Sequence, residues 1–343
     1  MHITKRPIFS LKIGVQVTAL TLLCFSMLNI FAPIHARTHL AIISNHAFKD
    51  STGRKFTAKK PFERIISLYG AHTENLFSLG ANDSVIGVSS NDAYPPEVSE
   101  KKAFSYRDDA EKFLAAKPDL ILIRPMIFRA YPELIQRMEQ TGIKVVSLQP
   151  GNLTEMYVYW QILGLLTGKE QTANQMVDRF KNAVNAYESL TDPIESKKKV
   201  YLEAIHDKMK TFTPDAMAAV VLKMAGGINV ALDAPQVRQT NIAYYGKERI
   251  LSKADQIDVY LAQYGAMNRP TIEMIKNEPG FQVIKAVCKN QVFIIDEVIV
   301  SRPTLRLLKG IFTMGRILYP NRFSQKGKEI LNAAKLETTE VSH

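Results

Sequence analysis

Residues 170–190, EQTANQMVDRFKNAVNAYESL, are the stretch that decides the fold of this 343-residue chain. The stretch contains neither Gly nor Pro, and its apolar residues recur at three- and four-residue steps, which predicts one face of an amphipathic helix. These residues are Ala173, Val177, Phe180, Val184 and Tyr187. The run 191–193, Thr-Asp-Pro, then ends the helix. At roughly 1.5 Å per residue such a helix is about 30 Å long, the width of a small domain.

Alternating strand and helix patterns flank this helix on both sides. Before it, the turn residues of DSTGR at 50–54 predict a leading hairpin. The strands predicted in this half are 64–68, 84–89, 119–123 and 144–148. The helices predicted in this half are 73–79, 109–116, 132–141 and 152–167, and we expect loops at 69–72, 91–107 and 124–131.

The pattern starts again after the helix. The strands predicted there are 200–204, 257–262 and 291–295, and the helices are 214–225, 247–253, 271–276 and 304–318. AEKFLAAKPDLILIRP in the first half resembles KERILSKADQIDVYLAQ in the second, and SLGANDSV resembles MAGGINVA. These echoes indicate one architecture used twice.

Short connections between alternating strands and helices predict an α/β fold. We expect two Rossmann-like lobes, each a mostly parallel sheet flanked by helices, bridged by one long α-helix. The predicted division is a signal peptide at 1–36, an N-terminal lobe at 37–168, an interlobe helix at 169–192 and a C-terminal lobe at 193–343. The alternative is a single larger domain on whose surface the helix lies.

The N-terminus carries an export signal. Basic residues precede an apolar run at 13–31, and PIHA predicts cleavage near Ala36. An uncleaved membrane anchor is the alternative, because the run is almost long enough to span a bilayer. A lipoprotein signal at Cys24 is less well supported, since bulky leucines precede it.

The mature chain is basic and has one thiol. Without the three basic residues of the signal, 41 Lys and Arg face 33 Asp and Glu, a net charge of +8. We expect a solvated surface with a few arginines that bind an acidic small ligand, and no nucleic acid partner. Cys288 would be the only cysteine left, so no disulfide is expected.

Ligands of parallel sheets bind beyond the carboxyl ends of the strands, so we look for a site in those loops. The loop after the first predicted strand of each half carries a histidine, His72 or His206. This pair could contact a polar ligand or ligate a metal. Aromatic and basic residues gather in the same loops, where guanidinium groups suit anionic oxygens and aromatic faces suit a bulky chelate. They are Tyr69, Tyr94, Tyr106, Arg107, Arg238, Tyr244, Tyr245, Tyr264 and Arg302.

Each of these residues has a simpler interpretation. Any single tyrosine could pack its own loop, and Met209 and Met267 suit core filling better than ligand contact. An enzyme is the contrasting class, but the sequence has no GxSxG, P-loop, GxGxxG after a strand, HExxH or Cys pair. We therefore expect a binding protein with no catalytic residues and no cofactor of its own.

The chain resembles the substrate-binding proteins of ABC importers for iron-siderophores, haem and vitamin B12, in which a single long helix joins two lobes. The resemblance covers about residues 48–320. The stretches that carry it are DSTGRKFTAKKPFERIISL, TENLFSLGANDSVIGVSS, KPDLILI, TGIKVVSLQP, KMAGGINVA, PGFQVIKAVCKNQVFIID and RPTLRLLKGIFTMGRILYP. It implies a periplasmic, monomeric receptor that captures a metal chelate between the lobes and delivers it to an inner-membrane permease.

The resemblance also implies an exposed acid on each lobe that docks on the permease. Glu74 matches this position in the first lobe, whereas the second lobe departs from the pattern and offers Asp215 as the nearest acid. For the ligand, a ferric siderophore is the first choice because its anionic oxygens suit Arg107, Arg238 and Arg302. Haem or a corrinoid is the alternative, and a bare metal ion comes third. A continuous bridging helix predicts only modest closure on binding.

Overall fold

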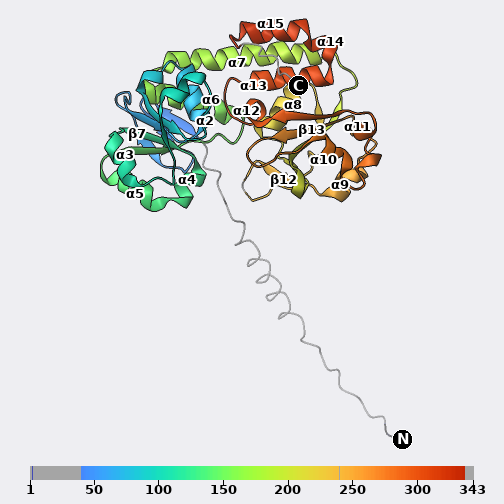
Figure 1. The fold of residues 1–343 in the computed structure, drawn as a ribbon, viewed down its shortest axis with the longest axis horizontal. Coiled ribbons are helices and arrows are strands. Elements are labelled where there is room, and N and C mark those ends of the chain that lie inside the picture. The colour runs from blue at the N-terminus through green and yellow to red at the C-terminus, as the bar shows by residue number, and fades with distance from the viewer. Residues whose placement is uncertain (1, 3–39, 239, 337–343) are drawn as a thin grey trace. The chain divides into compact units, whose positions relative to one another are not determined.

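The computed structural model describes residues 2, 40–238 and 240–336 (Figure 1). The described residues from 40 to 336 belong to one compact unit. The predicted signal peptide at 1–36 lies outside the described residues, apart from residue 2. Within the described part, no helix combines the length and hydrophobicity needed to cross a bilayer.

Helix α7, Glu170–Thr191, confirms the helix predicted from the opening stretch. All five residues of the predicted apolar face are buried, with exposures of 0–6%. The preceding helix α6, Leu153–Thr167, packs against α7, and a Cβ at Gly164 would lie only 2.7 Å from the Cβ of Ala173. In the same contact the rings of Trp160 and Phe180 meet edge to face at 5.5 Å. The elements before α7 are called the first lobe below, and those after it the second lobe.

The first lobe contains a five-stranded sheet in which every pairing is parallel. Its order is β6-β5-β4-β7-β8. The strands are β4 Ile65–Ser67, β5 Val85–Ser89, β6 Lys102–Phe104, β7 Leu120–Ile123 and β8 Lys144–Ser147. The other helices of this lobe are α2 Gly70–Ser78, α3 Ala110–Ala116, α4 Pro125–Ala130 and α5 Pro132–Gln140.

The second lobe contains a six-stranded mixed sheet of order β12-β10-β9-β13-β14, with β11 also paired to β9. The strands are β9 Lys199–Ile205, β10 Lys210–Phe212, β11 Ile228–Asn229, β12 Ile242–Tyr244, β13 Val259–Tyr264 and β14 Val292–Asp296. The helices are α8 Met217–Met224, α9 Lys247–Ser252, α10 Ile272–Asn277, α11 Lys285–Cys288, α12 Glu297–Val300, α13 Leu307–Leu318, α14 Pro320–Phe323 and α15 Gln325–Ala333.

The two sheets share a parallel unit that explains the sequence echoes. Strands β5-β4-β7-β8 of the first lobe have the same order and direction as β11-β9-β13-β14 of the second. The first echo pairs α3 and β7 with α9 and β13. The second echo pairs the segment before β5 with the segment that contains β11. The predicted α/β architecture used twice is therefore confirmed.

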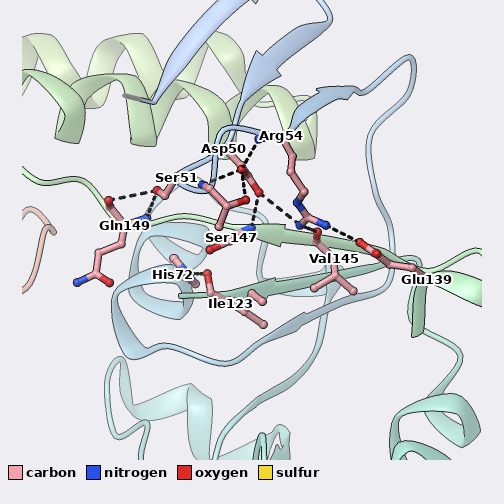
Figure 2. Close-up of polar contacts among 10 residues, drawn as sticks. Asp50, Ser51, Arg54, His72, Ile123, Glu139, Val145, Ser147 and Gln149 are labelled. Atoms are coloured by element: carbon pink, nitrogen blue, oxygen red, sulfur yellow. Dashed lines mark hydrogen bonds and ion pairs between the residues drawn. The ribbon is translucent and has the colours of Figure 1, made fainter. Parts of the chain in front are cut away.

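The leading hairpin is fixed to the first sheet by Asp50, which is fully buried (Figure 2). Strands β1 Ala41–Ser44, β2 Ala47–Lys49 and β3 Lys55–Thr57 form an antiparallel sheet, and the predicted DSTGR turn joins β2 to β3. The Asp50 carboxylate accepts hydrogen bonds within the turn from Thr52 and Arg54. It also accepts one from the amide of Ser147 in β8, at 3.3 Å. The buried carboxylate therefore holds both the turn and its attachment.

Several short elements escaped the sequence prediction. Strand β6 and helix α4 lie in segments that we predicted to be loops, and strand β10 and helix α12 lie between the elements predicted for the second half. Each has only three to six residues, too few for a periodic pattern to develop. The predicted loop 69–72 is also wrong in part, because α2 begins at Gly70 and places His72 in its first turn. The second sheet is mixed because β10 runs antiparallel to β9 and β12.

We expect Phe180→Ala to lower the free energy of unfolding by about 3–5 kcal/mol, because the ring is 1% exposed and its loss leaves a cavity beside Trp160. Urea denaturation followed by circular dichroism measures this change. Asn185→Ala on the exposed face of α7 is the control and should change stability by less than about 0.5 kcal/mol. Similar stabilities for the two variants would contradict the central role given to the buried face of α7.

Candidate functional site

The sheet order of the first lobe places its switch point between β4 and β7. Strand β4 is the first of the sheet in sequence, and the chain continues to β5 on one side and to β7 on the other. Ligands of doubly wound sheets bind at the carboxyl ends of such strands. Tyr69 follows β4 and Arg124 follows β7, and the Arg124 guanidinium lies 4.5 Å from the centre of the Tyr69 ring. The sequence analysis predicted Tyr69 but missed Arg124.

Exposed aromatic side chains occur beyond the carboxyl ends of strands in both lobes. Tyr94 follows β5 and is 38% exposed, Tyr244 ends β12 at 55%, and Tyr264 ends β13 at 46%. Met267, in the loop after β13, is 64% exposed, so the expectation that it fills the core is wrong. The exposed parts of these large side chains can contact a bulky ligand.

The predicted arginines differ in their surroundings. Arg107 and Arg238 are exposed. Arg302 is half-buried and reaches from the second lobe to the first, where a Cβ at Gly70 would lie 2.7 Å from its Nη1. Glycine at position 70 therefore leaves the space that this guanidinium occupies. Arg302 and Arg124 both oppose the rise that burial causes in the pKa of Tyr69.

Two other residues that we predicted to contact the ligand pack inside the protein instead. Tyr245 is 1% exposed within the core of the second lobe, and its hydroxyl donates to the Val230 carbonyl at 3.3 Å. Tyr106 is half-buried and packs against Tyr131 with ring centres 5.1 Å apart. The simpler packing interpretation therefore describes both residues in this structure.

His72 lies inside the first lobe with no exposed surface, and Figure 2 shows its contact with Ile123. Its Nδ1 is 2.7 Å from the Tyr159 hydroxyl and its Nε2 is 3.2 Å from the Ile123 carbonyl. The pKa of His72 is lowered to about 3, mainly by burial; the hydrogen bond to the Ile123 carbonyl opposes this shift and the nearby Arg124 adds to it. His72 is therefore a neutral internal residue whose two ring nitrogens are both occupied.

His206 belongs to a buried polar network at the carboxyl end of β9. Its Nδ1 is 2.8 Å from Glu203, whose carboxylate also accepts hydrogen bonds from Tyr260 and Asn268. The hydrogen bond to Glu203 raises the pKa of His206. On the other side of the ring, Nε2 lies 3.8 Å from Glu278. His206 therefore helps to position the loops after β9 and β13. Among the described residues, no group of three or more His, Cys, Asp or Glu could hold a metal ion.

The two predicted docking acids are placed differently. Asp215 is exposed near the start of α8. Glu74 is only 3% exposed and forms a two-point ion pair with Arg306, Nε to Oε1 at 2.8 Å and Nη2 to Oε2 at 2.5 Å. The exposure that we expected of Glu74 is therefore contradicted. The second-lobe arginine that covers it lies more than 200 residues away in the sequence, so no local pattern could reveal the pair.

Two hollows of the described surface lie away from these residues. A groove of about 530 Å³ lies between α7 and α15, and a smaller one of about 300 Å³ lies beside the leading hairpin. Neither is lined by a predicted ligand-binding residue. The candidate site is thus defined by the exposed side chains at the carboxyl ends of the strands.

Comparison with known proteins agrees with this arrangement. The model of the periplasmic binding protein family matches residues 65–299. The ABC transporter substrate-binding lipoprotein YvrC of Bacillus subtilis is 26% identical over 281 residues, which cover 80% of this chain and 86% of that protein. The vitamin B12-binding protein of Vibrio cholerae is 25% identical over 261 residues, which cover 74% of this chain and 88% of that protein.

Solved structures show the same fold. The crystal structure of a possible iron-binding, periplasmic solute-binding protein from Staphylococcus epidermidis superposes with a TM-score of 0.67 at 29% identity, covering 76% of this chain and all of that one. The chain therefore belongs to the periplasmic binding protein family, whose members are binding proteins of ABC importers and not enzymes.

The buried neutral state of His72 predicts a stability that depends on pH. A histidine whose pKa falls on folding contributes stability that is complete above its unfolded pKa of about 6.5 and is lost as the pH falls toward 3. Between pH 7 and pH 5 we expect this loss to be about 2 kcal/mol. Urea denaturation at several pH values should show it in the wild type and not in His72→Asn.

The control is His46→Asn, because His46 is exposed. It should follow the wild-type pH profile. If His72→Asn loses as much stability as the wild type over this pH range, His72 is charged in the folded protein and the described burial is incorrect.

Proposed function

We propose that the chain is the substrate-binding component of an ABC importer that captures a ferric siderophore between its lobes and delivers it to an inner-membrane permease. The observation that carries this proposal is the set of exposed side chains beyond the carboxyl ends of the strands. Tyr94, Tyr244 and Tyr264 offer aromatic faces, and Arg107 and Arg238 offer exposed guanidiniums. An anionic chelate with a large organic surface satisfies both kinds of group.

The proposed ligand brings its metal fully coordinated. His72 is buried with both ring nitrogens hydrogen-bonded. His206 is buried with Nδ1 bonded to Glu203 and with Nε2 3.8 Å from the Glu278 carboxylate, so protein groups surround both histidines. This favours a chelate that needs no protein ligand over haem held by an axial histidine. It also argues against a bare metal ion, which needs several protein ligands at one point.

A corrinoid is the second candidate. Exposed Met267 and the tyrosines suit the wide apolar face of a macrocycle better than arginines alone would. The similarity to a vitamin B12-binding protein supports the same ligand class. A siderophore and a corrinoid differ in charge, so the dependence of affinity on the arginines distinguishes them.

The remaining parts of the proposal follow from this role. The chain is exported to the periplasm, acts as a monomer without a cofactor of its own, and divides at residues 168 and 192 into two lobes joined by α7. Asp215 contributes to permease docking from the second lobe. The lobes close only modestly on the ligand, because a continuous helix bends less than a pair of loops.

Capture without turnover is the first test. The purified protein, expressed without residues 1–36, should bind a ferric siderophore or cobalamin in isothermal titration calorimetry. Denaturation should then release the ligand with an unchanged mass. A product of altered mass would mean catalysis, and the absence of binding to both ligand classes would refute the proposed substrate.

The arginines provide the second test. Arg107→Ala, Arg238→Ala and Arg302→Ala should each weaken binding of an anionic ferric siderophore by about 1 kcal/mol or more, because a charge-assisted hydrogen bond is lost. Arg316→Ala, an exposed change on α13, is the control and should bind as the wild type does. Wild-type siderophore affinity in all three variants would refute the proposed contact of these arginines with the ligand.

A further inference from the structure

The segment 302–306 of the second lobe is tied to the first lobe by several polar contacts. The Pro303 carbonyl accepts a hydrogen bond from Asn75 Nδ2 at 3.0 Å and another from Trp160 Nε1 at 3.1 Å. Three residues later, Arg306 forms the two-point ion pair with Glu74. These bonds join the start of α13 to α2 and α6, so they link the lobes independently of α7.

The contacts are buried, which sets them apart from ordinary surface pairs. Glu74 is 3% exposed and Arg306 is 8% exposed. A buried ion pair adds little net stability compared with apolar residues of similar size, whereas removal of one partner leaves an uncompensated charge. Such a pair is better suited to specify one arrangement of two bodies than to strengthen the fold.

The same segment contains one residue of the proposed ligand site and contacts another. The Arg306 guanidinium lies 4.1 Å from the centre of the exposed Tyr94 ring. Arg302, directly before Pro303, lies against Gly70 beside Asp92. Tyr94 and Arg302 therefore hold their positions through the contacts that tie the lobes together.

We propose that Glu74 and Arg306 form a clasp between the lobes, and that Arg306 is a positioning residue that sets Tyr94 and Arg302 in place before the ligand arrives. The clasp also covers the Glu74 carboxylate. Any partner that binds this carboxylate must first displace Arg306. The placement of ligand groups rests on the proposed function, whereas the clasp itself does not.

The chain contains its own reporter for the clasp. Trp160 is the only tryptophan in the sequence, is fully buried, and donates its indole N–H to the clasp segment. If the clasp opens, this hydrogen bond breaks and water and quenchers reach the indole. Acrylamide quenching and the emission maximum of Trp160 therefore report on the clasp without a ligand.

The first experiment compares Glu74→Gln and Arg306→Gln with the wild type in the absence of ligand. We expect stronger quenching, red-shifted emission and a larger radius of gyration by small-angle X-ray scattering in both variants. Arg316→Gln is the matched control, because Arg316 is exposed on α13, the helix that begins directly after Arg306. It should reproduce the wild-type values. Wild-type emission and scattering in both clasp variants would overturn the proposal.

Two further variants separate the clasp from a general loss of folding. Arg306→Lys keeps the charge but not the two-point geometry and should give an intermediate effect. The exchange Glu74→Arg with Arg306→Glu restores a pair of opposite charges and should recover part of the wild-type emission. If circular dichroism shows that Glu74→Gln and Arg306→Gln do not fold, the Arg306→Lys variant and the double exchange decide the result. Wild-type emission in Arg306→Lys, together with no recovery of emission in the double exchange, would refute the clasp.

A last measurement tests the positioning role with ferric siderophore and cobalamin as probes. The Arg306→Lys variant should bind the same probe as the wild type, but with lower affinity, even though the Arg306 side chain contacts Glu74 and Tyr94. If Arg306→Lys binds the probe with wild-type affinity but its Trp160 emission is altered, the positioning role is refuted and the clasp is still supported. If the wild type binds neither probe, the proposed substrate fails, and the ligand-free measurements still decide the clasp.

Discussion

The buried face of α7 is the constraint on which the rest of the structure depends. Its apolar residues join one hydrophobic cluster that also takes in α6 of the first lobe and α8 and α13 of the second. Since each lobe completes its core on the same helix, neither can move far without exposing apolar surface to water. The helix therefore limits how the sheets of the two lobes face each other.

The parallel strands that the two sheets share decide where function can lie. These strands are buried, so polar and aromatic groups for a ligand come from the segments that follow them. Some polar groups there are exposed, as Tyr94, Tyr264 and Arg238 are. Others, such as His206 and His72, are buried with partners and keep the adjoining segments in place. Burial separates residues that can meet a ligand from those that support them.

Long periodic elements and turn chemistry were predictable from sequence. The helix at 170–190, the DSTGR turn and the core strands appeared where expected, because their patterns act over neighbouring residues. The short elements α4, α12, β6 and β10 were missed, since a few residues hold too little periodicity. Arg124 was missed as well, because its closeness to Tyr69 comes from the pairing of β4 with β7.

The sequence by itself determined the class of fold, its internal repetition and the loops that carry aromatic and basic residues, because each follows from local periodicity and composition. Only the tertiary structure decided which of those residues are available. It buried His72, His206 and Tyr245, exposed Met267, and covered Glu74 with Arg306. Burial and ion pairing depend on contacts between residues far apart in the chain, and these contacts cannot be inferred from the hydrophobic pattern along the chain.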